Sequence, residues 1–159
     1  MDIRTGLERI KALGRQDSWL AVLVTQRRSG EPAASVVNAG VVDHPVTGEP
    51  VVALVARGRT AKLAHLRRTP RATLVFRAGW DWTGVTGSVQ LAGPDDELPE
   101  LDAEALRQLL RDIYHAAGGE HPDLEEYDRA MAEDRRTAVL ITPESFSSNP
   151  AGADHVDSE

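Results

Sequence analysis

The stretch that decides the fold is PVVALVARGRTAKLAHLRRTPRATLVFRAGW, residues 50–80. Its first part, 51–56, is an apolar run rich in β-branched residues, which is the composition of a buried strand. Thr60 follows after a short break and predicts a helix start, because its side-chain oxygen can accept N–H groups of a first turn. Pro70 ends that helix, since the residue before a proline is displaced from helical angles. Residues 72–76 form a second strand, so the stretch predicts strand, short helix, strand.

The same stretch is strongly basic. It contains seven cations and no Asp or Glu, although the whole chain carries a net charge of −7. The cations are Arg57, Arg59, Lys62, Arg67, Arg68, Arg71 and Arg77. Arg59, Thr60 and Lys62 surround the expected helix start, where free N–H groups and the positive end of the helix dipole favour a phosphate. The alternative interpretation is a solvated basic face that balances acidic neighbours.

Length and composition restrict the class of protein. A chain of 159 residues with 41% apolar residues is one ordinary domain with enough material for a core. The absence of cysteine excludes disulfides, thiolate metal sites and a cysteine nucleophile. The acidic balance argues against general nucleic-acid binding. The opening MDIRTGLERIKALG lacks an apolar signal region, and no run reaches the about 18 apolar residues of a membrane span, so we expect a cytoplasmic protein without a membrane partner.

The rest of the chain predicts three more helices and four more strands. The helices are expected at about 5–13 with a capping box at Thr5, at 103–117 and at about 123–133. The strands are expected at 19–25, 34–42, 81–91 and 136–142. Six short strands with short turns favour a mainly β protein with helices (α+β), built on one small antiparallel barrel.

Three further features of the chain bear on this organisation. Glycines within the strand 81–91 indicate a bulge or a close approach of two backbones. The polar segment after Thr142 is expected to fray. We therefore treat residues 1–150 as a single domain and residues 151–159 as a flexible acidic tail.

No side chain stands out as a catalytic group or a metal ligand. The five histidines have no metal-ligand spacing. No serine lies in a nucleophile-elbow sequence, which argues against hydrolase chemistry. Trp80 and Trp82 are most simply anchors of a core or of a dimer interface. Asn38 is unusual within a strand and predicts either a buried hydrogen-bonding residue or a contact with a ligand.

Several segments match one known family in the same order along the chain. They are 35–40 (SVVNAG), 59–63 (RTAKL) with Leu66, 70–72 (PRA), Trp82 with Val85 and Gly87, 126–129 (EYDR), 133–136 (EDRR) and 141–144 (ITPE). Together they resemble the split-barrel flavin/deazaflavin oxidoreductases, which share a fold with pyridoxamine 5′-phosphate oxidase. The most similar branch uses the deazaflavin coenzyme F420. The likeness covers nearly all of residues 5–150, and the ordered set is more specific than any one motif.

This resemblance implies a fold, an assembly and a cofactor site. The fold would be a six-stranded antiparallel split β-barrel of the FMN-binding type, in a homodimer with the cofactor at the subunit boundary. Arg59, Thr60 and Lys62 would meet the coenzyme phosphate. The cofactor site would further include three residues of the second strand, of which the last two border the ring, and a tryptophan near the pocket; these are Ser35, Val37, Asn38 and Trp82.

The function that the resemblance implies is hydride transfer from coenzyme F420 to a small unsaturated or conjugated substrate. In such enzymes the cofactor supplies the chemistry and the protein supplies binding, orientation and a dry pocket. The phosphate and acidic tail of a deazaflavin suit the basic stretch better than an uncharged ligand would. Two alternatives stay open: an FMN-dependent enzyme like pyridoxamine phosphate oxidase, and a non-catalytic protein that binds flavin, deazaflavin or haem.

Overall fold

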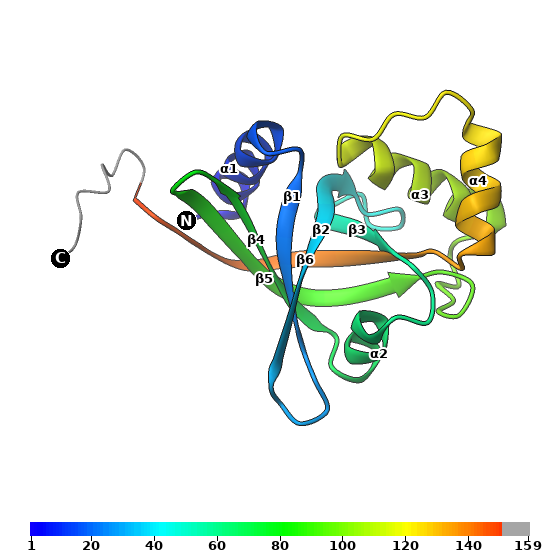
Figure 1. Ribbon diagram of the computed structural model, residues 1–159, viewed down its shortest axis with the longest axis horizontal. Helices are drawn as coiled ribbons and strands as arrows, with labels where there is room; N and C mark the ends of the chain where they lie inside the picture. Colours follow the sequence, from blue (N-terminus) through cyan, green and yellow to red (C-terminus); the bar gives the residue numbers. More distant parts are fainter. Residues whose placement is uncertain (151–159) are drawn as a thin grey trace.

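The computed structural model describes residues 1–150, which form a closed six-stranded barrel with four helices around it (Figure 1). The strands are β1 (Leu20–Gln26), β2 (Pro32–Asp43), β3 (Pro50–Ala56), β4 (Arg71–Ala78), β5 (Asp81–Ala92) and β6 (Thr137–Ser148). The helices are α1 (Ile3–Gln16), α2 (Ala61–Arg68), α3 (Ala103–Ala116) and α4 (Leu124–Glu133). The order around the barrel is β1-β2-β3-β6-β5-β4, and every pair is antiparallel. The expected mainly β, six-stranded antiparallel barrel is confirmed.

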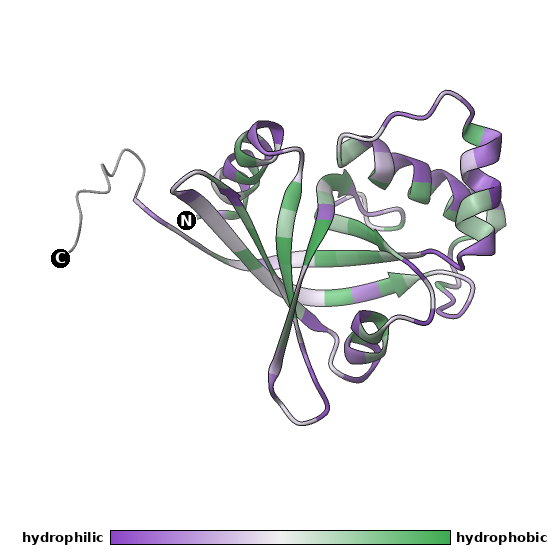
Figure 2. Cartoon of the chain, in the orientation of Figure 1, coloured by the Kyte–Doolittle hydropathy of each residue, from purple (hydrophilic) through white to green (hydrophobic). Residues whose placement is uncertain are grey.

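Strand β3 explains how the core is divided. Val52 and Leu54 belong to the core inside the barrel. Val51 and Ala53 point to the other side and belong to a second core beneath α3. Because β3 is buried on both faces, its sequence is a continuous apolar run instead of an alternating one. Figure 2 shows the green, apolar strands meeting the mixed faces of the helices that cover them.

Helix α1 differs from its expected bounds at both ends. It begins at Ile3 because Asp2 is the N-cap, and the Asp2 carboxylate accepts the N–H of Thr5 at 2.7 Å. The expected capping box at Thr5 is therefore wrong. The helix also continues past Gly14 to Gln16. Gly14 lies where a side chain would meet the ring of Trp19, so its small size serves packing and not helix termination.

Strand β6 is longer than the sequence predicts. The expected strand ended at Thr142, yet β6 continues to Ser148 and pairs with β5 along this length. The expected fraying after Thr142 is therefore wrong as far as Ser148. The register shifts between Thr86 and Gly87, where a side chain on Gly87 would collide with the carbonyl oxygen of Thr142. The predicted bulge and close backbone approach within β5 are confirmed at this glycine.

The structure bears on the expected tail and on the expected absence of a membrane span only within residues 1–150. The flexible tail at 151–159 lies outside the described residues. Among residues 1–150, no helix is long and apolar enough to cross a membrane.

Candidate functional site

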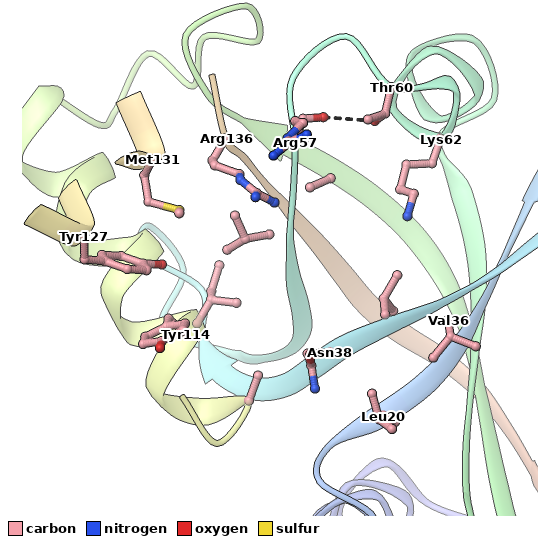
Figure 3. A pocket seen from close by; sticks show the side chains of 15 residues that line it. Leu20, Val36, Asn38, Arg57, Thr60, Lys62, Tyr114, Tyr127, Met131 and Arg136 are labelled. Carbon is pink, nitrogen blue, oxygen red and sulfur yellow. Dashed lines mark hydrogen bonds between the residues drawn. The ribbon is translucent and has the colours of Figure 1, made fainter. Parts of the chain in front are cut away.

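A cavity of about 450 Å³ opens where β1, β2 and β3 meet the start of α2 and the α3–α4 pair (Figure 3). The strands contribute Leu20, Val36, Val37, Asn38, Val55 and Ala56. The helices α3 and α4, with the C-cap residue of α3, contribute Ile113, Tyr114, Ala117, Tyr127 and Met131. The polar residues Arg57, Thr60, Lys62 and Arg136 line the remaining wall. The cavity therefore has an apolar, partly aromatic wall and a cationic wall, the pattern of a site for a ligand with a flat body and an anionic group.

The cationic wall is built on the start of α2. Thr60 is the N-cap, as expected, but the expected capping bond is wrong. Its hydroxyl donates to the carbonyl oxygen of Arg57 at 3.0 Å, and no side chain caps the first turn. Lys62 points into the cavity and, within residues 1–150, has no carboxylate partner (Figure 3). Free first-turn N–H groups beside an unpaired ammonium group favour a phosphate.

Two arginines at the same wall share one carboxylate. The Asp134 Oδ2 atom lies 3.3 Å from Arg136 and 3.5 Å from Arg57. The Nε–H of Arg136 is buried and has no hydrogen-bond partner in the described part of the chain. Figure 3 shows both guanidinium groups at the cavity. With Lys62 included, three cations face one anion, so the wall retains a positive charge and an unused N–H donor.

The aromatic wall is held by backbone contacts. The ring centroids of Tyr114 and Tyr127 lie 4.6 Å apart. The Tyr127 hydroxyl donates to the carbonyl oxygen of Leu110 at 3.2 Å, and the Tyr114 hydroxyl donates to that of Glu120 at 3.0 Å. Burial raises the pKa of Tyr127 to about 12. Both hydroxyls are engaged in structural bonds, so these residues present ring surface to a ligand and not a group for acid–base chemistry.

Four of the seven residues expected to bind a cofactor line this cavity: Val37, Asn38, Thr60 and Lys62. Asn38 is exposed and not buried. Its amide nitrogen donates to the carbonyl oxygen of Ser18 at 2.9 Å, so it makes a hydrogen bond and also borders the cavity. Of the two interpretations of Asn38, a buried role is therefore excluded, and contact with a ligand stays a prediction.

The other three expected residues do not line the cavity. Arg59 lies in the adjoining loop with φ of 63° and faces a neighbouring surface hollow. Ser35 pairs with Leu23, farther along β2. Trp82 lies near the end of β6, where its backbone N–H donates to the Asn149 side-chain oxygen at 2.9 Å. Roles for these residues in cofactor binding stay predictions.

The sequence reasoning missed part of the site. The site also includes residues of the α3–α4 pair, which packs over the ends of the strands, and the residue just before β6; these are Tyr114, Tyr127, Met131 and Arg136. Their sequence pattern was that of ordinary amphipathic helices. The EYDR and EDRR segments carried a family resemblance but no assigned role.

No group of three or more potential metal-ligand side chains occurs within residues 1–150.

Comparison with known proteins places the fold. No family model matches the sequence. A conserved hypothetical protein of Mycobacterium tuberculosis is 17% identical, with a TM-score of 0.65 over 93% of this chain and 84% of that one. A pyridoxamine 5′-phosphate oxidase-related, FMN-binding protein of Nostoc punctiforme is 18% identical, with a TM-score of 0.58 over 92% and 81%. An F420 reductase is 12% identical, with a TM-score of 0.56 over 83% and 91%. The chain therefore has the barrel fold of the pyridoxamine 5′-phosphate oxidase-like proteins.

Proposed function

We propose that this protein is an oxidoreductase that binds coenzyme F420 in the cavity and reduces a small unsaturated or conjugated substrate. When bound, the cofactor supplies the hydride chemistry, and the protein supplies orientation and a dry surrounding. The sequence resemblance supports the proposal. So does the fold shared with an F420 reductase and with an FMN-binding protein.

The observation that carries the proposal is the uncapped first turn of α2 at the cavity. The Thr60 hydroxyl donates to the carbonyl oxygen of Arg57 and does not cap the helix, so the first-turn N–H groups have no side-chain acceptor. Lys62 adds an ammonium group with no carboxylate partner among the described residues. A phosphate accepts hydrogen bonds from both kinds of donor. The residues present therefore fit the phosphate of a deazaflavin or a flavin.

The remaining walls fit the other parts of the cofactor. Val37 and Val55 offer an apolar surface to a planar ring. The Asn38 amide nitrogen is used by Ser18, so its oxygen is the atom that would accept an N–H of that ring. Arg57 and Arg59 are exposed beside the helix start, where the carboxylates of a deazaflavin tail would pass. FMN has no such tail, which is why we favour the deazaflavin.

We also propose a homodimer, with the cavity at the subunit boundary. Support comes from the outer face of β1 and β2, where Val22 pairs with Val36. Val36 is 67% exposed, and Leu20 and Val22 are also exposed. Leu20 and Val36 both line the cavity and continue this apolar face (Figure 3). A second copy covering the face would remove apolar surface from water and close the cavity on one side.

The proposal is tested by titrating the purified protein with oxidised and reduced F420, FMN, FAD and haem. We expect saturable binding of F420, tighter than that of the other three, followed by oxidation of reduced F420 when a panel of unsaturated carbonyl compounds is added. FMN retained at full occupancy through purification would favour the FMN-dependent oxidase instead. Binding of F420, flavin or haem with no turnover of any substrate would favour a binding protein.

A further inference from the structure

A second cavity, of about 380 Å³, lies between α3 and α4. Its apolar lining includes Leu106 and Leu110 of α3 and Ala132 of α4. Met131 and Arg136 line both this cavity and the one at α2, so these two side chains form the boundary between them. The two cavities are therefore adjacent, and ligands bound in them would be neighbours.

The rim of this second cavity is cationic. Arg107, Arg129 and Arg136 line it, and Asp128 is the one carboxylate among its described lining residues. Both Asp128 oxygens are already held, because the Arg111 Nε and Nη2 groups donate to them at 2.9 and 2.5 Å. These bonds lower the pKa of Asp128, so it stays ionised and engaged. An anionic ligand meets arginines here and no free carboxylate.

Arg136 lies where the two cavities meet, and its guanidinium group is only partly paired. Its terminal nitrogen is 3.3 Å from Asp134, whereas its buried Nε–H has no partner within the described chain. Leaving a buried N–H of a charged group without an acceptor is costly. The charge of Arg136 is therefore only partly paired, and it would attract a carboxylate that reaches the terminal nitrogens of its planar guanidinium group.

We propose that the second cavity and Arg136 bind an amphipathic carboxylate. Its apolar body lies between α3 and α4 against Leu106 and Leu110, and its carboxylate pairs with the guanidinium group of Arg136. This inference rests on the proposed function, under which the ligand is the substrate. The substrate class is then an unsaturated acid with an apolar skeleton, and not an uncharged compound.

The two methionines of the chain provide a direct readout of binding. Met131 lies at the boundary of the cavities, whereas Met1 is exposed at the N-terminus. The protein is labelled with ¹³C at the methionine methyl groups and titrated with 2-naphthoate and, separately, with the uncharged 2-naphthylmethanol. We expect 2-naphthoate to shift the Met131 signal saturably and leave Met1 unmoved, with an affinity at least about tenfold higher than that of the alcohol. No saturable shift up to about 10 mM, or equal affinities for the two probes, would overturn the inference.

Paired variants locate the probe. Ala132→Leu fills the second cavity from an exposed helix position, and Ala130→Leu makes the same change at an exposed position of α4 outside its lining. We expect Ala132→Leu to weaken 2-naphthoate binding at least about tenfold and Ala130→Leu to leave it unchanged. Arg136→Gln should abolish the preference for the acid, and Arg136→Lys should keep part of it. Equal binding by the two leucine variants, or an unchanged preference in Arg136→Gln, would contradict the proposal.

A last comparison separates this inference from the proposed function. Lys62→Ala changes the cationic wall at α2 and not the second cavity. We expect it to weaken F420 binding and leave the dissociation constant of 2-naphthoate unchanged. If F420 binds the wild-type protein and 2-naphthoate does not, the substrate class is wrong and the function stands. If 2-naphthoate binding is lost in Lys62→Ala and kept in Ala132→Leu, the acid occupies the cofactor cavity and the inference fails.

Discussion

The hydroxyl of Thr60 donates its hydrogen bond to the carbonyl oxygen of Arg57 at 3.0 Å, and so it does not accept an N–H of the helix that it precedes. The loop that makes this bond is fixed from outside as well. The Gly58 N–H donates to the Asp134 carbonyl oxygen at 3.0 Å, and a side chain at Gly58 would meet Arg135. The first turn of α2 is thereby held in place with its N–H groups available, which is the arrangement that a phosphate site requires.

The first prediction concerns the choice of cofactor. FMN has one anionic group, its phosphate, whereas F420 also has tail carboxylates, which the exposed Arg57 and Arg59 would attract. We expect F420 to bind more tightly than FMN at about 20 mM salt, with the margin shrinking at about 500 mM, because exposed ion pairs are screened. Fluorescence titrations at both salt concentrations measure this. Equal or tighter FMN binding at low salt would contradict the assignment.

The second prediction concerns the dimer. Val36→Lys places a charge at the centre of the exposed apolar face of β1 and β2, and burying that charge in an interface is costly. We expect the wild-type protein to sediment as a dimer and Val36→Lys to sediment as a monomer at micromolar concentration. Val46→Lys is the control, since Val46 is also an exposed valine but lies in the β2–β3 turn. A wild-type monomer, or a Val36→Lys dimer of unchanged stability, would remove the support for a shared cavity.

The third prediction concerns Tyr127. Burial raises its pKa from 10.0 to about 12, so the phenol stabilises the folded state fully below pH 10, and that contribution is lost as the pH rises toward 12. We expect Tyr127→Phe to lower the free energy of unfolding by about 1 kcal/mol at about pH 9, because the bond to Leu110 is lost. The difference between wild type and variant should shrink toward about pH 11.5. Urea denaturation at both pH values measures it, and a constant difference would show that the phenol does not titrate as its burial implies.

The fourth prediction concerns the bulge in β5. Gly87→Ala would bring a methyl group against the Thr142 carbonyl oxygen, a backbone atom that cannot move without breaking the pairing with β6. We expect a loss of at least about 1–3 kcal/mol in the free energy of unfolding. Gly84→Ala, on the same strand, meets the flexible Ser147 side chain at 3.2 Å, so its effect should be under about 1 kcal/mol. Equal melting temperatures for the two variants would mean that the strands can separate at Gly87 without cost.

The barrel could be predicted because its signals are local. Residues 51–56 and 72–76 are short apolar runs bounded by breaks, and such patterns identify strands directly. The second half of β6 could not be predicted in the same way. Residues 143–148 begin with a proline and are mostly polar, and they are held by backbone pairing with β5 and by the packing of Phe146 against the core. Backbone hydrogen bonds do not depend on side-chain type, so a strand held mainly by them shows no hydrophobic pattern in its sequence.

Only the part of the candidate site that lies on a single element, the start of α2, could be predicted from the sequence. Thr60 and Lys62 were found because a helix start has its own chemistry, and the position of the start was right although the Thr60 bond was not. Tyr127 and Arg136 could not be assigned, because their presence at the cavity depends on how α3 and α4 pack over the strands. The boundary between the two cavities is likewise a product of packing and has no local signature.

Whether the start of α2 binds the cofactor phosphate is tested by comparing Lys62→Ala with Arg68→Ala. Both changes remove one positive charge from α2, but Lys62 lines the cavity and Arg68 is exposed at the far end of the helix. We expect Lys62→Ala to lose about 1.5–3 kcal/mol of F420 binding, roughly 10- to 100-fold in affinity, at an unchanged melting temperature, and Arg68→Ala to bind almost as the wild type does. Equal affinities in the two variants would contradict phosphate binding at α2 and leave the basic stretch as a solvated surface.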